Sequence, residues 1–178
     1  SSLVNDLLSL TRIERMEHSP PSEKVDLGKI LQEVEQICID RNLFNKIKCK
    51  FVVSKKKYEI LGDPPELKQV FLNIIENAVT HSNSKKAVVV KLGSVKSLIN
   101  FSVEDFGIGI PNENIPLLTK RFYRVDEARS RNSGNTGLGL SIVKHIVNRH
   151  NAELSINSIE GKGTKFSIIF NKDKPSLL

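Results

Sequence analysis

Two asparagines spaced one helical turn apart are the first residues of this 178-residue chain that could support chemistry. Asn73 and Asn77 continue a four-residue interval that begins at Gln69, and Thr80 and His81 follow them. Side chains at this spacing share one stripe of a helix. Each amide offers a carbonyl oxygen to a metal such as Mg²⁺ and an amino group to a phosphate oxygen. The pair therefore predicts a metal and phosphate site, and an ordinary polar stripe on a surface helix is the alternative.

A carboxylate and two glycines form the next candidate cluster. Asp105, Gly107 and Gly109 lie in the run Asp-Phe-Gly-Ile-Gly, directly after an apolar strand-like segment. A carboxylate at a strand end can accept the amino hydrogen of adenine, and glycines let backbone approach the base. A tight turn is the alternative for this motif alone. The Asp-Phe-Gly triplet matches a protein-kinase signature by accident, because the other signatures of that family are missing.

Two further glycine-rich stretches lie closer to the C-terminus. Gly137 and Gly139 flank Leu138 and lead directly into a helical pattern. Such a loop directs backbone N–H groups and the positive end of the helix dipole toward an anion. It is not a Walker loop, because Gly-Lys-Ser/Thr is absent, and it is not a dinucleotide-binding fingerprint, because the spacing of its glycines is wrong. The second stretch, residues 161–166, predicts by itself only a hairpin turn.

Taken in order, these motifs resemble the N, G1, F, G2 and G3 boxes of the ATP-binding domain of sensor histidine kinases, within the GHKL superfamily. The F box corresponds to Phe122-Tyr123-Arg124, and the resemblance covers roughly residues 26–171. It implies an α+β fold, a two-layer α/β sandwich with a mixed, mostly antiparallel sheet, helices on one face and a preceding N-terminal helix. It also implies a protein histidine kinase of two-component signalling that uses ATP and Mg²⁺.

The resemblance gives each motif a role in nucleotide binding. It implies that Asp105 reads the adenine amino group, with Gly109 and Thr164 nearby. Backbone groups of the G2 loop would contact the triphosphate. The implied cofactor-binding residues are Asn73, Asn77, His81, Asp105, Gly107, Gly109, Ile110, Phe122, Arg124, Thr136, Gly137, Leu138, Gly139, Leu140 and Thr164.

Catalysis and metal binding are implied for a smaller set. Asn73, Asn77 and Arg124 would be the catalytic residues, and Asn77 and Asn73 the metal ligands, with the choice between the two asparagines left open. Residues 111–136 would form an ATP lid that brings Arg124 near the phosphates. Such a lid is long and contains glycine, so we expect it to be disordered without nucleotide.

The chain departs from the family pattern just after the second asparagine. A basic residue and then a tyrosine usually stand there, whereas this sequence has Thr80 and His81. One phosphate-neutralising charge is therefore missing, and His81 would border the base or ribose instead. This departure favours, as one alternative, a degenerate nucleotide-binding or docking module, although the complete glycine set argues against it.

The other alternative is a GHKL-type ATPase. Such relatives carry a water-activating glutamate four residues before the magnesium asparagine, and here that position is Asn73. Glu76 lies on the same predicted helix but not one turn before Asn77. Without a base for water, we expect slow hydrolysis and transfer of the phosphoryl group to a protein acceptor.

None of the four histidines has the sequence context of a phosphorylated histidine, with an acidic residue next and a proline soon after. The acceptor is therefore predicted upstream of residue 1, on the protein's own dimerisation and phosphotransfer domain. Residues 1–17 resemble the end of the second helix of that domain. The resemblance further implies a response regulator receiver domain as partner and a homodimeric full-length protein.

Helical spacing and turn residues predict the elements that must position these groups. Asp63, Pro64 and Glu66 have the types of an N-cap, a first helical residue and the partner of a capping box. Proline at positions 20 and 21 ends the first helix, whose apolar stripe needs a partner to cover it. The stripe and the linker favour the second half of a helical hairpin, with a core helix of this domain as the alternative. On the first interpretation, removal of residues 1–20 is expected to leave the thermal midpoint and ATP binding nearly unchanged. The predicted helices are 3–16, 26–42, 63–80, a short one near 115–122, and 138–149; the strands are 47–53, 58–61, 87–92, 99–104, 153–157 and 165–170. The predicted layout is a helix over 1–17, a linker over 18–25, the catalytic domain over 26–171 and a tail over 172–178.

Composition limits the other classes of function. The chain is 39% hydrophobic and 26% charged, as expected for a globular domain, and it has no apolar run of membrane-spanning length. Its first residues have neither a basic nor an apolar region, so no signal peptide is predicted from them. Its net charge of +7 is dispersed without interleaved aromatic residues, which argues against nucleic acid as a partner. Cys38 and Cys49 are predicted to be free thiols in a reducing compartment. We therefore expect a cytoplasmic domain, whether or not the parent protein is anchored in a membrane.

Overall fold

A five-stranded sheet forms one layer of the molecule in a computed structural model that describes residues 2–16, 19–54, 56–82, 85–125 and 136–172. The strand order is β2-β4-β5-β7-β6, with β2 parallel to β4 and the other neighbours antiparallel. The strands are β2 (Cys49–Val53), β4 (Val88–Val95), β5 (Leu98–Glu104), β6 (Glu153–Ile159) and β7 (Gly163–Asn171). The prediction of a mixed, mostly antiparallel sheet is confirmed.

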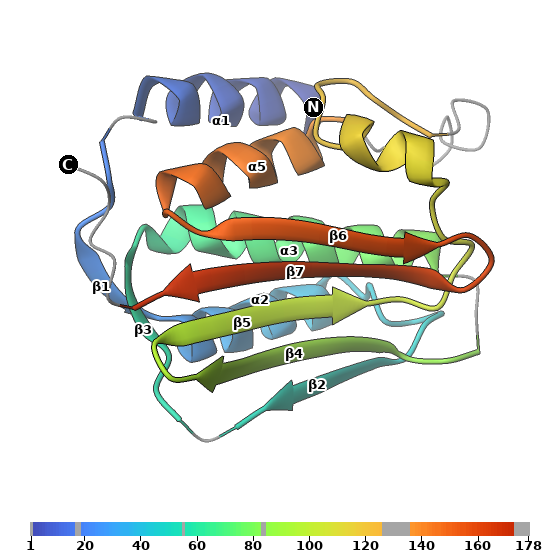
Figure 1. Cartoon of the computed structure of the whole chain (residues 1–178), viewed down its shortest axis with the longest axis horizontal. Helices are drawn as coiled ribbons and strands as arrows, with labels where there is room; N and C mark the ends of the chain where they lie inside the picture. Colours follow the sequence, from blue (N-terminus) through green and yellow to red (C-terminus); the bar gives the residue numbers. More distant parts are fainter. Residues whose placement is uncertain (1, 17–18, 55, 83–84, 126–135, 173–178) are drawn as a thin grey trace.

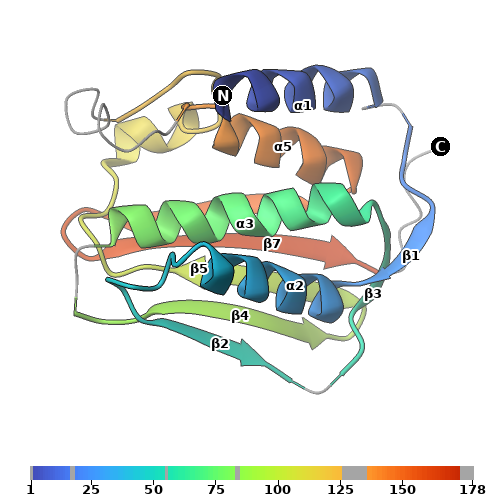
Figure 2. The ribbon, with the colours of Figure 1, turned by 180° about the vertical axis from the view of Figure 1, so that it is seen from behind.

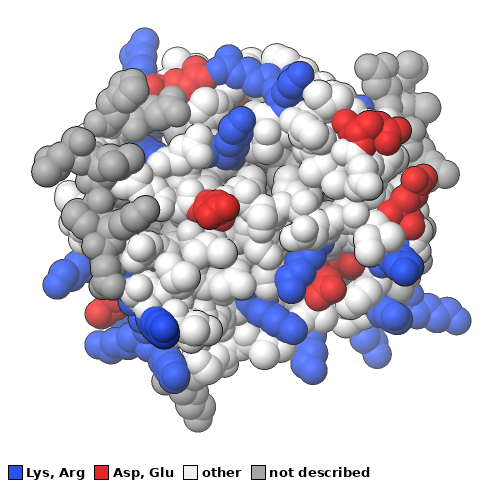
Figure 3. Space-filling view, in the orientation of Figure 1, with Lys and Arg blue, Asp and Glu red and all other residues white. Residues whose placement is uncertain are grey.

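Three helices cover one face of this sheet, as the two opposite views in Figures 1 and 2 show. They are α2 (Leu27–Asp40), α3 (Pro64–His81) and α5 (Gly139–Arg149). The rings of Phe71 on α3 and Phe101 on β5 stack with their centroids 4.0 Å apart in the core between the layers. The predicted two-layer α/β sandwich is therefore confirmed. Figure 3 shows basic and acidic side chains spread over the opposite, open side of the sheet.

A second, two-stranded sheet joins β1 (Glu23–Asp26) to β3 (Glu59–Gly62) in antiparallel fashion. Residues 23–25 were predicted to belong to a linker, but Val25 pairs with Ile60 and both side chains are buried. A single apolar residue in a polar segment gives no periodic signal, so this strand could not be found from its own sequence.

The start of α3 follows the prediction in part. Asp63 caps the helix by accepting a hydrogen bond from the Glu66 backbone N–H, and a proline occupies the first turn. The reciprocal half of the predicted capping box is wrong, because the Glu66 carboxylate instead accepts a 2.5 Å hydrogen bond from Arg149. The Asp63 N–H donates to His150 Nε2 at 3.0 Å. The Glu66 carboxylate therefore pairs with the Arg149 guanidinium instead of capping the helix.

The N-terminal helix α1 (Ser2–Met16) packs along α5 on the side away from the sheet (Figure 1). Leu10 and Ile13 are each only 2% exposed and belong to the main core, whereas Leu8 is 65% exposed. The structure therefore does not support the prediction that residues 1–20 are dispensable for stability. The apolar stripe of this helix is covered in part by α5.

The segment after β5 also differs from the prediction. A 3₁₀ helix, η1 (Asn112–Leu117), takes the place of the short helix predicted near 115–122. Pro116 lies inside it and cannot donate the backbone hydrogen bond that a longer α-helix would need. Within the described ranges, no helix combines the length and apolarity that crossing a bilayer requires.

Candidate functional site

Asp105 lies at the end of β5 as a buried, oriented carboxylate. Asp105 is only 4% exposed, and its Oδ1 accepts hydrogen bonds from the N–H groups of Gly107 at 2.9 Å and Thr164 at 3.3 Å. Burial raises the pKa of this carboxyl, and the two N–H groups oppose that rise. Within the described residues, Oδ2 has no hydrogen-bond partner. The group can therefore accept one further hydrogen bond from a ligand.

The glycines around Asp105 are fixed by close backbone packing. A Cβ on Gly107 would stand 2.2 Å from the carbonyl oxygen of His81, at the end of α3. Gly109 has φ +69°, and its Cβ would meet the carbonyl oxygen of Ile159 at 2.2 Å. The predicted G1 turn therefore lies directly between α3 and the β6–β7 hairpin, and Ile110 continues it.

His81 borders the same turn. Desolvation by the surrounding protein lowers the pKa of its imidazole, and the charge of Asp105 opposes this shift. Its side chain keeps substantial exposure to solvent. The structure thus brings His81 to the Asp105 end of the site, although no hydrogen bond between the two side chains is formed.

The two predicted asparagines differ in their contacts. The Asn73 Nδ2 donates to the carbonyl oxygen of Gly139 at 3.2 Å, so Asn73 ties α3 to the first turn of α5. Asn77 is half-buried, and its side chain makes no hydrogen bond to any described residue. The whole amide of Asn77 is therefore open to a ligand, whereas Asn73 keeps only its Oδ1 for one.

Asn73, Asn77 and His81 recur every four residues and form one stripe along α3. At a rise of about 1.5 Å per residue, the stripe spans roughly 12 Å from the Gly139 contact to the Gly107 contact. The helix therefore connects the carboxylate turn with the glycine loop of α5. A ligand that touches both ends must be elongated, with a nucleobase-like group at the Asp105 end and an anionic group at the α5 end.

The loop before α5 forms the second end of the site. The Phe122 N–H donates to the Gly137 carbonyl oxygen at 3.1 Å, and the Leu138 N–H donates to Thr136 Oγ1 at 3.3 Å. Among the described residues, the N-cap position of α5 is Leu138, whose side chain makes no capping hydrogen bond to the first turn. The N–H groups of its first turn, which include Gly139 and Leu140, lie where an anion would find donors and a positive dipole end.

Arg124 and Phe122 lie against this loop. A Cβ on Gly137 would be 3.4 Å from the Arg124 Cγ and 3.1 Å from the Phe122 Cα. The Phe122 side chain is 58% exposed, whereas Leu138 is fully buried and anchors the loop in the core. Leu138 can therefore offer a ligand only its backbone. The predicted lid residues 126–135, including Gly134 and Asn135, lie outside the described residues.

Helix α1 contacts the loop before α5 and the last turn of α5, which sequence reasoning missed. The Thr136 hydroxyl donates to the Asp6 carboxylate at 2.6 Å, beside the glycine loop. At the other end, Arg149 Nε donates to the carbonyl oxygens of Met16 and Ser19 at 3.1 and 2.9 Å. An ion pair between Glu14 and Arg121 lies between these contacts.

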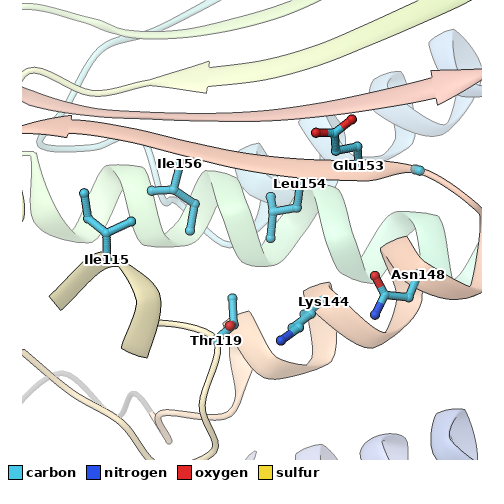
Figure 4. Close-up of a pocket in the computed structure, with 8 residues that line it drawn as sticks. Ile115, Thr119, Lys144, Asn148, Glu153, Leu154 and Ile156 are labelled. Atoms are coloured by element: carbon cyan, nitrogen blue, oxygen red, sulfur yellow. The ribbon is translucent and has the colours of Figure 1, made fainter. Parts of the chain in front are cut away.

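A separate groove opens between η1, α5 and the edge strand β6 (Figure 4). Ile115, Leu154 and Ile156 form its apolar part, and Lys144 and Asn148 project from α5 along it. None of the predicted site residues lines this groove. It is therefore distinct from the site along α3.

Residues 62–174 match the family described as histidine kinase-, DNA gyrase B- and HSP90-like ATPases. The chain is 35% identical to the phosphate regulon sensor protein PhoR of Pseudomonas aeruginosa over 173 residues, or 95% of the chain and 38% of PhoR. It is 38% identical to the sensor protein kinase WalK of Staphylococcus haemolyticus over 93% of the chain and 27% of WalK. The chain thus spans well under half the length of these relatives.

Two solved structures also resemble this chain. The mycobacterial sensor histidine kinase MprB superimposes with a TM-score of 0.70 at 26% identity, covering 84% of this chain and 97% of that one. Full-length ShkA in complex with AMPPNP gives 0.79 at 24% identity and covers 99% of this chain and 36% of ShkA, a likeness of fold. The chain belongs to the family of histidine kinase-, DNA gyrase B- and HSP90-like ATPases. Within it, the chain is a catalytic ATP-binding domain of the sensor histidine kinase type.

Proposed function

We propose that this domain binds ATP along α3 and passes its γ-phosphoryl group to a histidine on a dimerisation and phosphotransfer domain. The observation that carries the proposal is the Asp105 carboxylate, whose Oδ1 is held by two backbone N–H groups while Oδ2 stays available. A buried acceptor of this kind suits the amino group of adenine and opposes the O6 of guanine. His81, Gly107, Gly109, Ile110 and Thr164 would surround the base or ribose.

The triphosphate would extend to the start of α5. The uncapped N-terminus of that helix supports this orientation, because phosphate oxygens accept hydrogen bonds from its N–H groups. Arg124 lies against Gly137 and would contribute positive charge near the transferred group. Asn73 holds Gly139 and would keep this loop in position.

Asn77 fits the role of magnesium ligand. Its half-buried amide makes no hydrogen bond to the described residues, so its oxygen is available to a hard cation. Among those residues no group of three or more His, Cys, Asp and Glu side chains is arranged to hold a metal, so phosphate and water would complete the coordination. Bound Mg²⁺ would neutralise phosphate charge, while Asn77 fixes where that charge lies.

Transfer to a protein fits this site better than hydrolysis. A water-activating base would stand one turn before Asn77, and that position is Asn73, whose Nδ2 is already committed to Gly139. An amide has no basic group for proton abstraction at neutral pH. Positioning and charge neutralisation would therefore provide most of the rate.

The proposal extends to the signalling pathway through relatives named as sensor proteins and sensor kinases. In this scheme, α1 belongs to the second helix of the phosphotransfer domain, the full-length protein is a homodimer, and a response regulator receives the phosphoryl group. The domain would act in the cytoplasm, whether or not the full-length protein is anchored in a membrane.

Calorimetric titration with ADP and Mg²⁺ tests the site. Asp105→Asn should weaken binding by about tenfold to a hundredfold, as expected for a lost hydrogen bond to a charged group, and should reduce selectivity for ADP over GDP. Asn77→Ala should remove most of the magnesium-dependent affinity, whereas Asn157→Ala, an exposed change on β6, should not. Unchanged affinity in both site variants would show that the nucleotide binds elsewhere.

A further inference from the structure

The hydroxyl of Ser158, on β6, contacts both turns that surround Asp105. The Ile110 N–H donates to Ser158 Oγ at 2.8 Å, which fixes the end of the G1 turn. Ser158 Oγ also donates to the Gly163 carbonyl oxygen at 3.0 Å and lies 2.9 Å from Thr164 Oγ1. None of the sequence motifs that identify the site includes Ser158.

These three contacts use the whole hydrogen-bonding capacity of one hydroxyl. A serine hydroxyl has one hydrogen to donate and two lone pairs to accept with. The Gly163 carbonyl can only accept, so it takes the hydrogen of Ser158, and the Ile110 N–H takes one lone pair. The hydrogen of Thr164 Oγ1 must then point to the second lone pair of Ser158. The Thr164 hydroxyl oxygen can then only accept hydrogen bonds from any other partner.

The same two turns hold the carboxylate in place. Thr164 donates its N–H to Asp105 Oδ1 and accepts the Asp105 N–H at its carbonyl oxygen, at 3.3 and 2.9 Å. Gly163 lies so close that a Cβ on it would be 2.1 Å from the Asp105 carbonyl oxygen. A shift of the Gly163–Thr164 turn would therefore move the carboxylate with it.

We propose that Ser158 is a positioning residue for base selectivity, which locks the two turns around Asp105 and makes the Thr164 hydroxyl an acceptor toward the bound base. The inference rests on the proposed nucleotide site. Two acceptors, Asp105 Oδ2 and Thr164 Oγ1, match the two N–H hydrogens of the 6-amino group of adenine and oppose the carbonyl oxygen that guanine carries at the same position. Without Ser158, the Thr164 hydroxyl can rotate and donate, so guanine would be rejected less strongly.

The test compares ADP and GDP affinities of the whole chain by calorimetry. Ser158→Ala should weaken ADP binding about tenfold and lower the ratio of ADP to GDP affinity, because two backbone groups lose their partner and Thr164 is released. Ser158→Thr, which keeps the hydroxyl, should restore the ratio. Ser155→Ala on the same strand is the matched control, because Ser155 makes no side-chain hydrogen bond to the described residues.

The selectivity ratio separates positioning from general loss of structure, since simple destabilisation weakens both nucleotides alike. If Ser158→Ala keeps the wild-type ratio while Asp105→Asn loses it, the role of Ser158 is refuted and the nucleotide site stands. If the wild-type chain shows no preference for ADP, both proposals fail. Should Ser158→Ala not fold, Ser158→Cys gives the same comparison, because a thiol is a weak hydrogen-bond partner of similar size.

Discussion

Arg149, in the last turn of α5, donates from Nε to the carbonyl oxygen of Met16, the last residue of α1. The same guanidinium reaches Ser19 and, through Nη1, the Glu66 carboxylate in the first turn of α3. Its side chain is only 4% exposed. One buried charge therefore joins the end of the N-terminal helix to two helices of the catalytic domain.

Replacing this arginine should destabilise the fold strongly. Arg149→Ala leaves the buried Glu66 carboxylate without its partner, and removal of one member of a buried pair costs about 3–5 kcal/mol. Urea unfolding measures the change. Arg121→Ala is the control, because its pair with Glu14 is about half exposed and should contribute less than about 1 kcal/mol. A loss for Arg149→Ala as small as the one expected for Arg121→Ala would show that Arg149 has no structural role.

The docking of α1 on α5 can be tested with two leucines of the same helix. Leu10→Ala should lower the free energy of unfolding by about 2 kcal/mol or more, because Leu10 is buried. Leu8→Ala, at a position 65% exposed, should have little effect. If both variants unfold at the wild-type urea concentration, α1 does not pack on the domain in solution.

Two glycines of the β6–β7 hairpin should respond differently to alanine. Gly161 has φ +77° with no atom within 4 Å of an added Cβ, so Gly161→Ala should cost only about 1 kcal/mol. Gly163→Ala places its Cβ against Asp105 backbone and should reduce both the thermal midpoint and ADP affinity markedly. Normal ADP binding by Gly163→Ala would contradict the tight coupling of this turn to Asp105.

Stability should fall in mild acid because of His150. Its ring is fully buried, its Nε2 accepts from Asp63 N–H, and its Nδ1 donates to the Ile146 carbonyl oxygen at 2.8 Å. Desolvation lowers its pKa, with Arg149 adding to the shift and the Ile146 bond and Asp63 opposing it. Glu66 also faces the ring.

The lowered pKa fixes the direction of the effect. Below the usual histidine pKa of about 6.5, the unfolded chain takes up a proton that the folded chain resists, so stability is lost as pH falls from there toward the folded pKa. His150→Gln keeps an acceptor for Asp63 and removes the titration. It should flatten the dependence of unfolding free energy on pH below 6.5, and an unchanged slope would assign the loss to other groups.

Local motifs predicted much of this site because their parts are neighbours in sequence. Asp105 and Gly107 are two residues apart, and the hydrogen bond between them forms within one turn. Likewise, the four-residue spacing of Asn73 and Asn77 predicted their shared stripe on α3. Such features depend on local geometry, which residue types and spacing describe well.

The missed features depend on contacts between distant segments. Arg149 lies 83 residues from Glu66 and 133 from Met16, and Thr136 lies 130 residues from Asp6. No periodicity or motif indicates which buried charge will meet which backbone carbonyl across such separations. The reciprocal half of the capping box was wrongly predicted, and the packing of α1 on α5 was missed, for this one reason.

Phosphotransfer between separate chains tests the central claim most directly. The domain is mixed with labelled ATP, Mg²⁺ and a separately supplied dimerisation domain that carries an acceptor histidine. We predict acid-labile label on that histidine, slow phosphate release and no label on the domain itself, with transfer weak because no tether raises the effective concentration. Asn77→Ala should abolish transfer. Rapid release of phosphate by the domain alone, or acid-stable label on serine or threonine, would contradict its assignment as the catalytic domain of a histidine kinase.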